Sequence, residues 1–292
     1  MMANSKHSNR CLGVTSFKGC DRWFHPHVCV GALALLTSWN ALGQTCAEAN
    51  ISPQLGTEIS RWEELSRAGK RLVLETGHLH SKGLTFSVRC NVADGSLAWS
   101  DSRGTRTYRG ATNTGQAATS SSDIAHQKIS GSVHFHADAN WSLGGRWVHN
   151  TIHRSIQSNS QAEGYPEHFQ FNDVSLGVRY KHALSQHLMG QVDYWQGRIL
   201  PGQSNVTLPN FAPTRLQLGS GRSREIGISI GNKLGENDPA WTWSAAIHIR
   251  QERIEEGSPQ ALYKGSRLVA SAVQPAIGLR TSQFIAKLNY AF

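Results

Sequence analysis

The stretch that decides the fold is FIAKLNYAF, residues 284–292. Apolar residues occupy every second position from Phe284 to Phe292, and a mostly polar set lies between them. Successive side chains of a β-strand point to opposite faces, so this alternation predicts a strand with one apolar and one mostly polar face.

A terminal strand that alternates in this way and ends on an aromatic residue resembles the closing strand of Gram-negative outer-membrane β-barrels. The resemblance is carried by Phe284, Leu288, Tyr290 and Phe292. It implies an antiparallel transmembrane β-barrel, and it implies that these residues are the membrane-insertion signal read by the barrel-assembly machinery. It implies no particular activity.

From residue 70 onward, similar alternating runs are separated by turn residues. They give about ten strands, and bacterial single-chain barrels have even strand numbers. Eight and twelve strands stay open, because the segments 57–79 and 97–108 alternate weakly. Short and long connections also alternate, as periplasmic turns and external loops do. The first external loop is expected at 78–83, and the long ones are expected at 103–122, 157–167, 199–222 and 251–274. The predicted fold class is all-β, with one barrel domain over residues 70–292.

Composition separates this fold from other classes of protein. The chain has 292 residues, of which 17% are charged, and a mean hydropathy of −0.39. A bundle of transmembrane helices is excluded. Each helix needs roughly 20 apolar residues, and no segment after the leader has such a run. Barrel strands alternate, so their average hydropathy is polar. The alternative is a soluble β-sandwich or lipocalin-like barrel with its apolar face inward. Aromatic residues near strand ends favour the membrane, where they form interfacial girdles; examples are Trp141, Trp147, Tyr180, Tyr194 and Trp241.

The residues before the barrel indicate export. A basic stretch, an apolar run at 28–42 and the small-x-small pattern Ala47-Glu48-Ala49 predict a signal peptide and leader over 1–49. A single membrane anchor is the alternative. Four of the five cysteines lie in this leader, so only Cys90 would remain and no intramolecular disulfide is expected.

Residues 50–69 are predicted to be a short helix or a coil that leads into the barrel. Ile59, Trp62 and Leu65 are three residues apart, and Ser60 and Glu63 have the spacing of a capping box. A loose connection without regular structure explains the segment equally well.

If the apolar face meets lipid, the other face lines the lumen. A ten-stranded barrel is narrow, because eight strands are just filled by side chains. We therefore expect a paired charge network that fills the lumen, with a small anion-leaning channel as the alternative. Its expected members are Arg71, Glu75, Arg89, Arg146, Arg179, Lys181, Asp193, His248, Arg250 and Lys287.

No enzymatic site can be assigned from the sequence. Ten-stranded outer-membrane proteases of the omptin family use an Asp/His site in an external groove, but their motif residues cannot be matched onto this chain. An omptin-like or lipid-modifying enzyme therefore stays an alternative, with His149, His153 and His168 as weak candidates. No cofactor or metal motif is present, so neither is expected.

The formal net charge is +9, which in an exported chain favours anionic lipid over nucleic acid as a partner. The expected location is the outer membrane of a Gram-negative bacterium. The expected role is structural or surface-interacting. Expected partners are outer-membrane lipid, lipopolysaccharide, the assembly machinery and an extracellular ligand bound by the loops.

Overall fold

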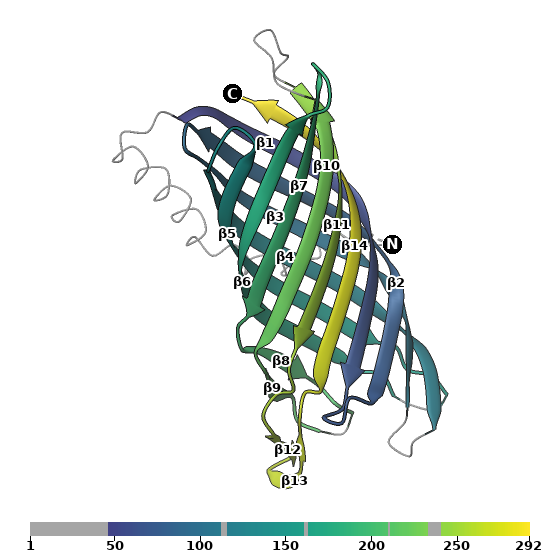
Figure 1. Ribbon diagram of the computed structural model, residues 1–292. Coiled ribbons are helices and arrows are strands. Elements are labelled where there is room, and N and C mark those ends of the chain that lie inside the picture. The colour runs from purple at the N-terminus through teal and green to yellow at the C-terminus, as the bar shows by residue number, and fades with distance from the viewer. Residues whose placement is uncertain (1–45, 112–115, 161–162, 210, 233–240) are drawn as a thin grey trace, which may run out of the picture. The chain divides into compact units, whose positions relative to one another are not determined.

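The computed structural model describes residues 46–111, 116–160, 163–209, 211–232 and 241–292. Within them, ten antiparallel strands form one closed barrel, as the alternation predicted. The pairings β1–β14 and β5–β6 close the ring (Figure 1). The barrel strands are β1 (Cys46–Leu65), β2 (Arg71–Cys90), β3 (Ala93–Ala111), β4 (Ala117–His136), β5 (Trp141–Ile156), β6 (Pro166–Ala183), β7 (Leu188–Ile199), β10 (Gly221–Asn232), β11 (Trp241–Ile254) and β14 (Ala276–Ala291).

Two hairpins are added at the end of the barrel opposite the C-terminus (Figure 1). The first consists of β8 (Gly202–Val206) and β9 (Thr214–Leu218), and β8 pairs with β6. The second consists of β12 (Gln260–Lys264) and β13 (Arg267–Ala272). Long connections mark the external end of such barrels, and short turns mark the periplasmic end. We therefore call the hairpin end external and the opposite end periplasmic.

The predicted external loops differ in outcome. The loops at 199–222 and 251–274 contain the two hairpins, and the connection between β5 and β6 lies at 157–165. The loop predicted at 103–122 is wrong, because β3 runs to Ala111 and β4 begins at Ala117. Both faces of β3 and β4 carry mostly polar residues there, because these parts of the strands lie beyond the lipid. The apolar alternation that would reveal a strand is therefore missing from the sequence.

The outward face of the barrel is apolar over a continuous zone. Leu55, Leu176 and Ile228 point outward with exposed fractions of 70%, 76% and 57%. We call this zone the lipid band; it runs from Ile51 to Ile59 on β1 and from Ile226 to Ile230 on β10. At its periplasmic side, the Trp141 ring contacts Tyr180 and the Trp241 ring contacts Tyr290, each tilted pair with centroids 4.7 Å apart. Such exposure excludes a lipocalin-like arrangement and fits a lipid-facing surface. No helix in the described part of the chain is long and apolar enough to cross a membrane.

The prediction of a helix or coil at 50–69 is wrong, because β1 covers Cys46–Leu65 and is a full barrel strand. The loop predicted at 78–83 likewise lies inside β2, and the first external connection is at residues 66–70. Ile59 points outward at the edge of the lipid band, whereas Trp62 points inward with 1% exposed. The apolar face thus changes sides as the strand leaves the lipid, which produces the three-residue spacing of a helix.

The expectation that no disulfide forms is also wrong. Cys46 at the start of β1 is bonded to Cys90 at the end of β2. Residues 46–49, assigned to the leader from the sequence, pair with β2 as part of the first strand. The rest of the predicted leader, including the apolar run at 28–42, lies outside the described residues. The signal peptide therefore stays a prediction.

Candidate functional site: the lumen and its external plug

The external part of the lumen is filled by a hydrophobic core. Its inward-facing side chains are each at most 3% exposed, and the rings of Trp62 and Phe169 lie 5.0 Å apart. We call this set the external plug. Its members are Trp62, Leu79, Ile124, Ile152, Phe169, Phe171, Ile199, Leu218, Ile254, Ile277 and Leu279. The alternation that lines the membrane-spanning lumen with polar groups places these apolar groups in part of the external lumen.

A buried charge cluster borders the plug. The Arg154 guanidinium pairs with Glu167, with Glu64 at 2.6 Å and with Glu75 at 3.4 Å. Arg106 lies 3.8 Å from Glu75, and the guanidinium of Arg154 lies 5.0 Å from the Trp62 ring centroid. These residues come from β1, β2, β3, β5 and β6. Buried charges are tolerated when they are paired, so the cluster ties five strands together across the lumen.

A second charge cluster lies where the plug ends. Arg250 donates to Asp173 at 2.6 Å, to Glu252 at 2.7 Å and to Glu225 at 3.1 Å. Arg146 pairs with the same Glu225 at 2.9 Å, and its guanidinium lies 4.5 Å from the Trp195 ring centroid. Asp173 and Glu252 are buried, whereas Arg146 and Glu225 face a cavity. This cluster therefore separates the plug from an open space below it.

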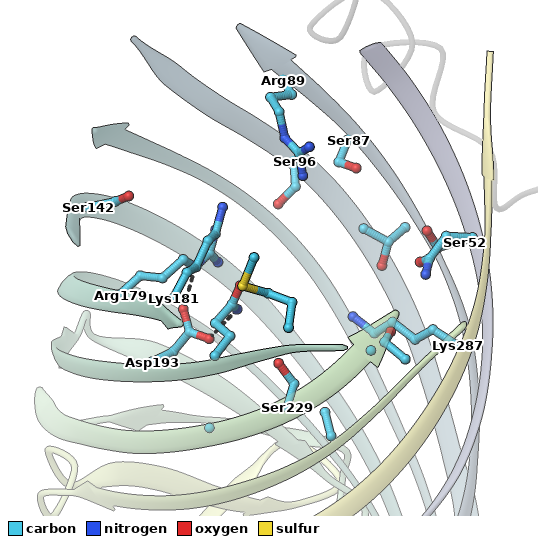
Figure 2. Close-up of a pocket in the computed structure, with 18 of the residues that line it drawn as sticks. Ser52, Ser87, Arg89, Ser96, Ser142, Arg179, Lys181, Asp193, Ser229 and Lys287 are labelled. Carbon is cyan, nitrogen blue, oxygen red and sulfur yellow. Dashed lines mark hydrogen bonds and ion pairs between the residues drawn. The ribbon is translucent and has the colours of Figure 1, made fainter. Parts of the chain in front are cut away.

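The periplasmic part of the lumen contains a cavity of about 1080 Å³. Figure 2 shows serines and basic side chains on its wall; these include Ser52, Ser87, Ser96, Ser142, Ser229, Arg89, Arg179, Lys181 and Lys287. Bulk water occupies about 30 Å³ per molecule, so this polar space has room for tens of waters. Asn91, Asp138 and Asn232 also line it, which places the cavity at the periplasmic turns.

Most cavity charges are held in pairs, either between neighbouring strands or, for Lys181 on β6 and Asp94 on β3, between separated strands across the lumen. Arg179 donates to Asp193 at 2.7 Å, and Lys181 donates to Asp94 at 3.1 Å. Arg89 donates to Glu48 at 3.3 Å. In Figure 2, Arg179, Lys181 and Asp193 gather on one side, and Lys287 extends from another. Paired charges on opposite walls give a polar lining without a strong field of one sign.

The carboxyl of Asp138, which lies outside the membrane, has a shifted pKa. Asp138 lies in the exposed turn between β4 and β5. Its carboxylate accepts backbone N–H groups from Asn140 at 2.7 Å and Trp141 at 2.8 Å. These hydrogen bonds favour the charged form and lower the pKa of the Asp138 carboxyl. The interaction fixes a tight periplasmic turn at the mouth of the cavity.

The structure distributes the predicted lumen residues over these regions. Glu75 belongs to the buried cluster beside the plug, and Arg250 belongs to the boundary cluster. Arg71 is exposed at the external end of β2 and joins neither. The others line the cavity, namely Arg89, Arg146, Arg179, Lys181, Asp193, His248 and Lys287.

Sequence reasoning missed several inward charges; they include Glu58, Glu64, Arg106, Arg154 and Asp173. Arg154 is in phase with Arg146 on β5, so continuing the alternation past Trp147 would have found it. Glu58 and Glu64 were missed because β1 was not recognised as a strand.

The three histidine candidates lie on the outer surface, away from the lumen. The His153 and His168 rings are 4.0 Å apart across the β5–β6 pair. His149 contacts the Asn172 side chain at 3.0 Å. Within the described ranges, no group of three or more His, Cys, Asp or Glu is placed to hold a metal ion. These histidines contact one another, the Trp147 ring, and amide or hydroxyl groups.

One solved structure is similar in fold to this chain over most of its length. No protein-family model matches the chain, and no curated protein matches it significantly. The outer-membrane protease OmpT from Escherichia coli is similar with a TM-score of 0.55 and 11% identity, over 85% of this chain and 98% of OmpT. The translocator domain of the autotransporter NalP from Neisseria meningitidis has a TM-score of 0.43 and 10% identity, over 91% and 96%. The β-domain of the Bordetella autotransporter BrkA has a TM-score of 0.42 and 13% identity, over 84% and 100%.

At these identities the likeness to OmpT is one of fold. The chain therefore has the fold of the bacterial outer-membrane β-barrels. Together with the exposed lipid band, this fold places it in the outer membrane.

Proposed function

We propose that this protein is a non-conducting outer-membrane barrel that acts through its external surface. The external plug carries the proposal, because its side chains are buried against one another across the lumen. A solute in the periplasmic cavity meets the Arg250 cluster first and then the apolar core. A small channel would need a polar path through both layers.

The external part is large enough to present a binding surface. On β2 the outward face becomes polar at Lys82, and the strand continues to Arg71. At about 3.3 Å per residue this is roughly 35 Å of strand beyond the lipid band. The hairpins β8–β9 and β12–β13 extend the same end further. Loops and hairpins on a rigid barrel are where such proteins bind partners.

Conductance in planar bilayers tests the closed lumen. The intact protein should give no regular conductance steps under conditions in which a porin does. Regular steps that change with Arg179→Gln, a cavity substitution, would favour the channel instead.

The surface role needs a separate test. Exposed Arg215, Lys264 and Arg267 lie on the hairpins, so a sulfated polysaccharide such as heparin is a suitable probe. We expect cells that display the intact protein to retain heparin, and a variant without residues 260–272 to retain less. If cells that lack the protein retain heparin equally well, the surface-binding role is wrong and only the structural role is left.

The proposal includes export by a signal peptide that ends before Cys46. The Cys46–Cys90 bond supports this boundary, because cleavage after Ala49 would remove Cys46. Ala41-Leu42-Gly43 is an earlier small-x-small pattern that keeps the cysteine. The bacterial periplasm is oxidising, so the bond can form there.

A further inference from the structure

Six arginines line one sector of the barrel at the external edge of the lipid band. The sector consists of the adjacent strands β7, β10, β11, β14 and β1. On β10 the outward positions Ile230, Ile228 and Ile226 are followed by Arg224 and Arg222. On β1 Ile59 is likewise followed by Arg61, and on β7, β11 and β14 one polar outward residue lies between the last apolar residue and the arginine. We call the set the arginine patch; its exposed members are Arg61, Arg198, Arg222, Arg224, Arg253 and Arg280.

The strand register brings like charges into direct opposition. Arg222 stands opposite Arg253 on β11 and opposite Arg198 on β7. Arg61 stands opposite Arg280 across β1 and β14. Like charges directly opposite each other destabilise a sheet. The free protein therefore holds three unfavourable pairs in one small area.

The protein itself supplies little compensation. Arg61 forms an ion pair with Glu63. Among the residues that the structure describes, no ion pair involves Arg198, Arg222, Arg224, Arg253 or Arg280. The opposite wall differs, because Arg103 on β3 pairs with Asp101 at 2.9 Å. Among the described strands, the direct opposition of two arginines is thus confined to this one sector.

A matching partner needs an apolar part and an anionic part, one above the other. Ile226 and Ile249 are paired outward residues immediately below the patch. Arginine guanidinium groups bind phosphate oxygens in a bidentate manner. We propose that the arginine patch binds the phosphate groups of an external-leaflet glycolipid, of the lipid A type, whose acyl chains lie against the lipid band. This site goes beyond the proposed surface role, and it does not depend on whether the lumen conducts.

Binding to a defined pair of lipids tests the site. Purified full-length protein in neutral detergent is titrated with bis-phosphorylated lipid A and with its dephosphorylated form. We expect preference for the phosphorylated lipid, and an affinity about tenfold or more lower in the triple variant R198Q/R222Q/R253Q, because each charged hydrogen bond contributes substantially. The matched control Arg103→Gln should change the affinity by less than about threefold. Equal binding of both lipids, or an equal loss in Arg103→Gln, would overturn the proposal.

The thermal transition of Arg222→Gln gives a second test, because the direction of its change should depend on whether lipid A is present. In neutral detergent, Arg222→Gln removes two like-charge pairs, so its thermal transition should be higher than that of the wild type. With lipid A present the order should reverse, because the variant has lost a phosphate ligand. A variant that is less stable in both conditions would mean that Arg222 is only structural.

Inorganic phosphate and pyrophosphate separate a lipid from a free anion. If either one alone stabilises the wild type as much as lipid A does, the acyl chains contribute nothing and the glycolipid proposal is wrong. Heat-dependent gel mobility confirms that each variant is folded before titration. The single variant Arg222→Gln supplies the same comparison if the triple variant does not fold.

Discussion

The membrane-spanning part of the barrel and its external part are built from the same strands with opposite patterns. In the lipid band Ile59 and Val174 point outward, while polar groups point into the lumen. A few residues further out, Trp62 on β1 and Phe171 on β6 point inward and are buried. The period of two is unchanged, but the apolar phase switches where lipid gives way to water. The surroundings of a strand therefore decide which of its faces is apolar. One strand can be apolar on the outward face within the lipid and on the inward face beyond it.

This comparison predicts that removal of a large apolar side chain matters most in the external part. Trp62→Ala should destabilise the barrel by about 3–5 kcal/mol, because Trp62 fills the plug and contacts Phe169. The measurement is the urea midpoint of the heat-sensitive gel band. Leu55→Ala, in the lipid band, is the control and should cost less, because Leu55 is 70% exposed to lipid. Equal shifts would mean that the plug is not a packed core.

An arginine placed on the outward face tests where the lipid band ends and the external part begins. Ile228→Arg, within the lipid band, should cost roughly 2–4 kcal/mol, because the guanidinium enters the bilayer. Thr107→Arg, outward on β3 in the external part, should cost less than about 1 kcal/mol. Refolding into lipid vesicles with urea titration measures both. Similar costs at the two positions would place the membrane boundary elsewhere.

The disulfide is predicted to have an intermediate effect. Cys90→Ser should lower stability by about 2 kcal/mol, near the lower end for disulfides, since β1 and β2 are already paired along their length. The mass of the exported protein gives the N-terminus, and thiol labelling before and after reduction reports the bond. A mature chain that begins at Asn50 would contradict both the bond and the proposed cleavage before Cys46.

Deletion of Phe292 should affect folded stability least. Its side chain is 69% exposed, but its backbone exchanges two hydrogen bonds with Ala49, so the change should be about 1 kcal/mol once the barrel is folded. We nevertheless expect less folded protein in the outer membrane of cells, because the terminal aromatic is the proposed signal for the assembly machinery. Heat-dependent mobility in isolated outer membranes measures this yield. Unchanged yield would remove Phe292 from the insertion signal.

The lumen residues show which parts of the candidate site can be predicted from alternation alone. Arg146, Arg179 and Asp193 were expected in the lumen, and the structure places them on the cavity wall. Glu64 and Arg154 were missed, although both follow the parity of their strands. They lie beyond the lipid band, where no exposed apolar run marks the strand. The three-residue step from Ile59 to Trp62 misled the reading of β1 for the same reason.

The sequence by itself determined the all-β class and the facing of the membrane-spanning residues, because period-two alternation ties each position to one side of a strand. Only the tertiary structure decided the external plug, the Cys46–Cys90 bond and the opposition of Arg222 with Arg253 and Arg198. Each of these depends on which residues of different strands lie at the same level, that is, at the same height along the barrel axis. Register and closure of the barrel set that level, and alternation within a single strand carries no information about it.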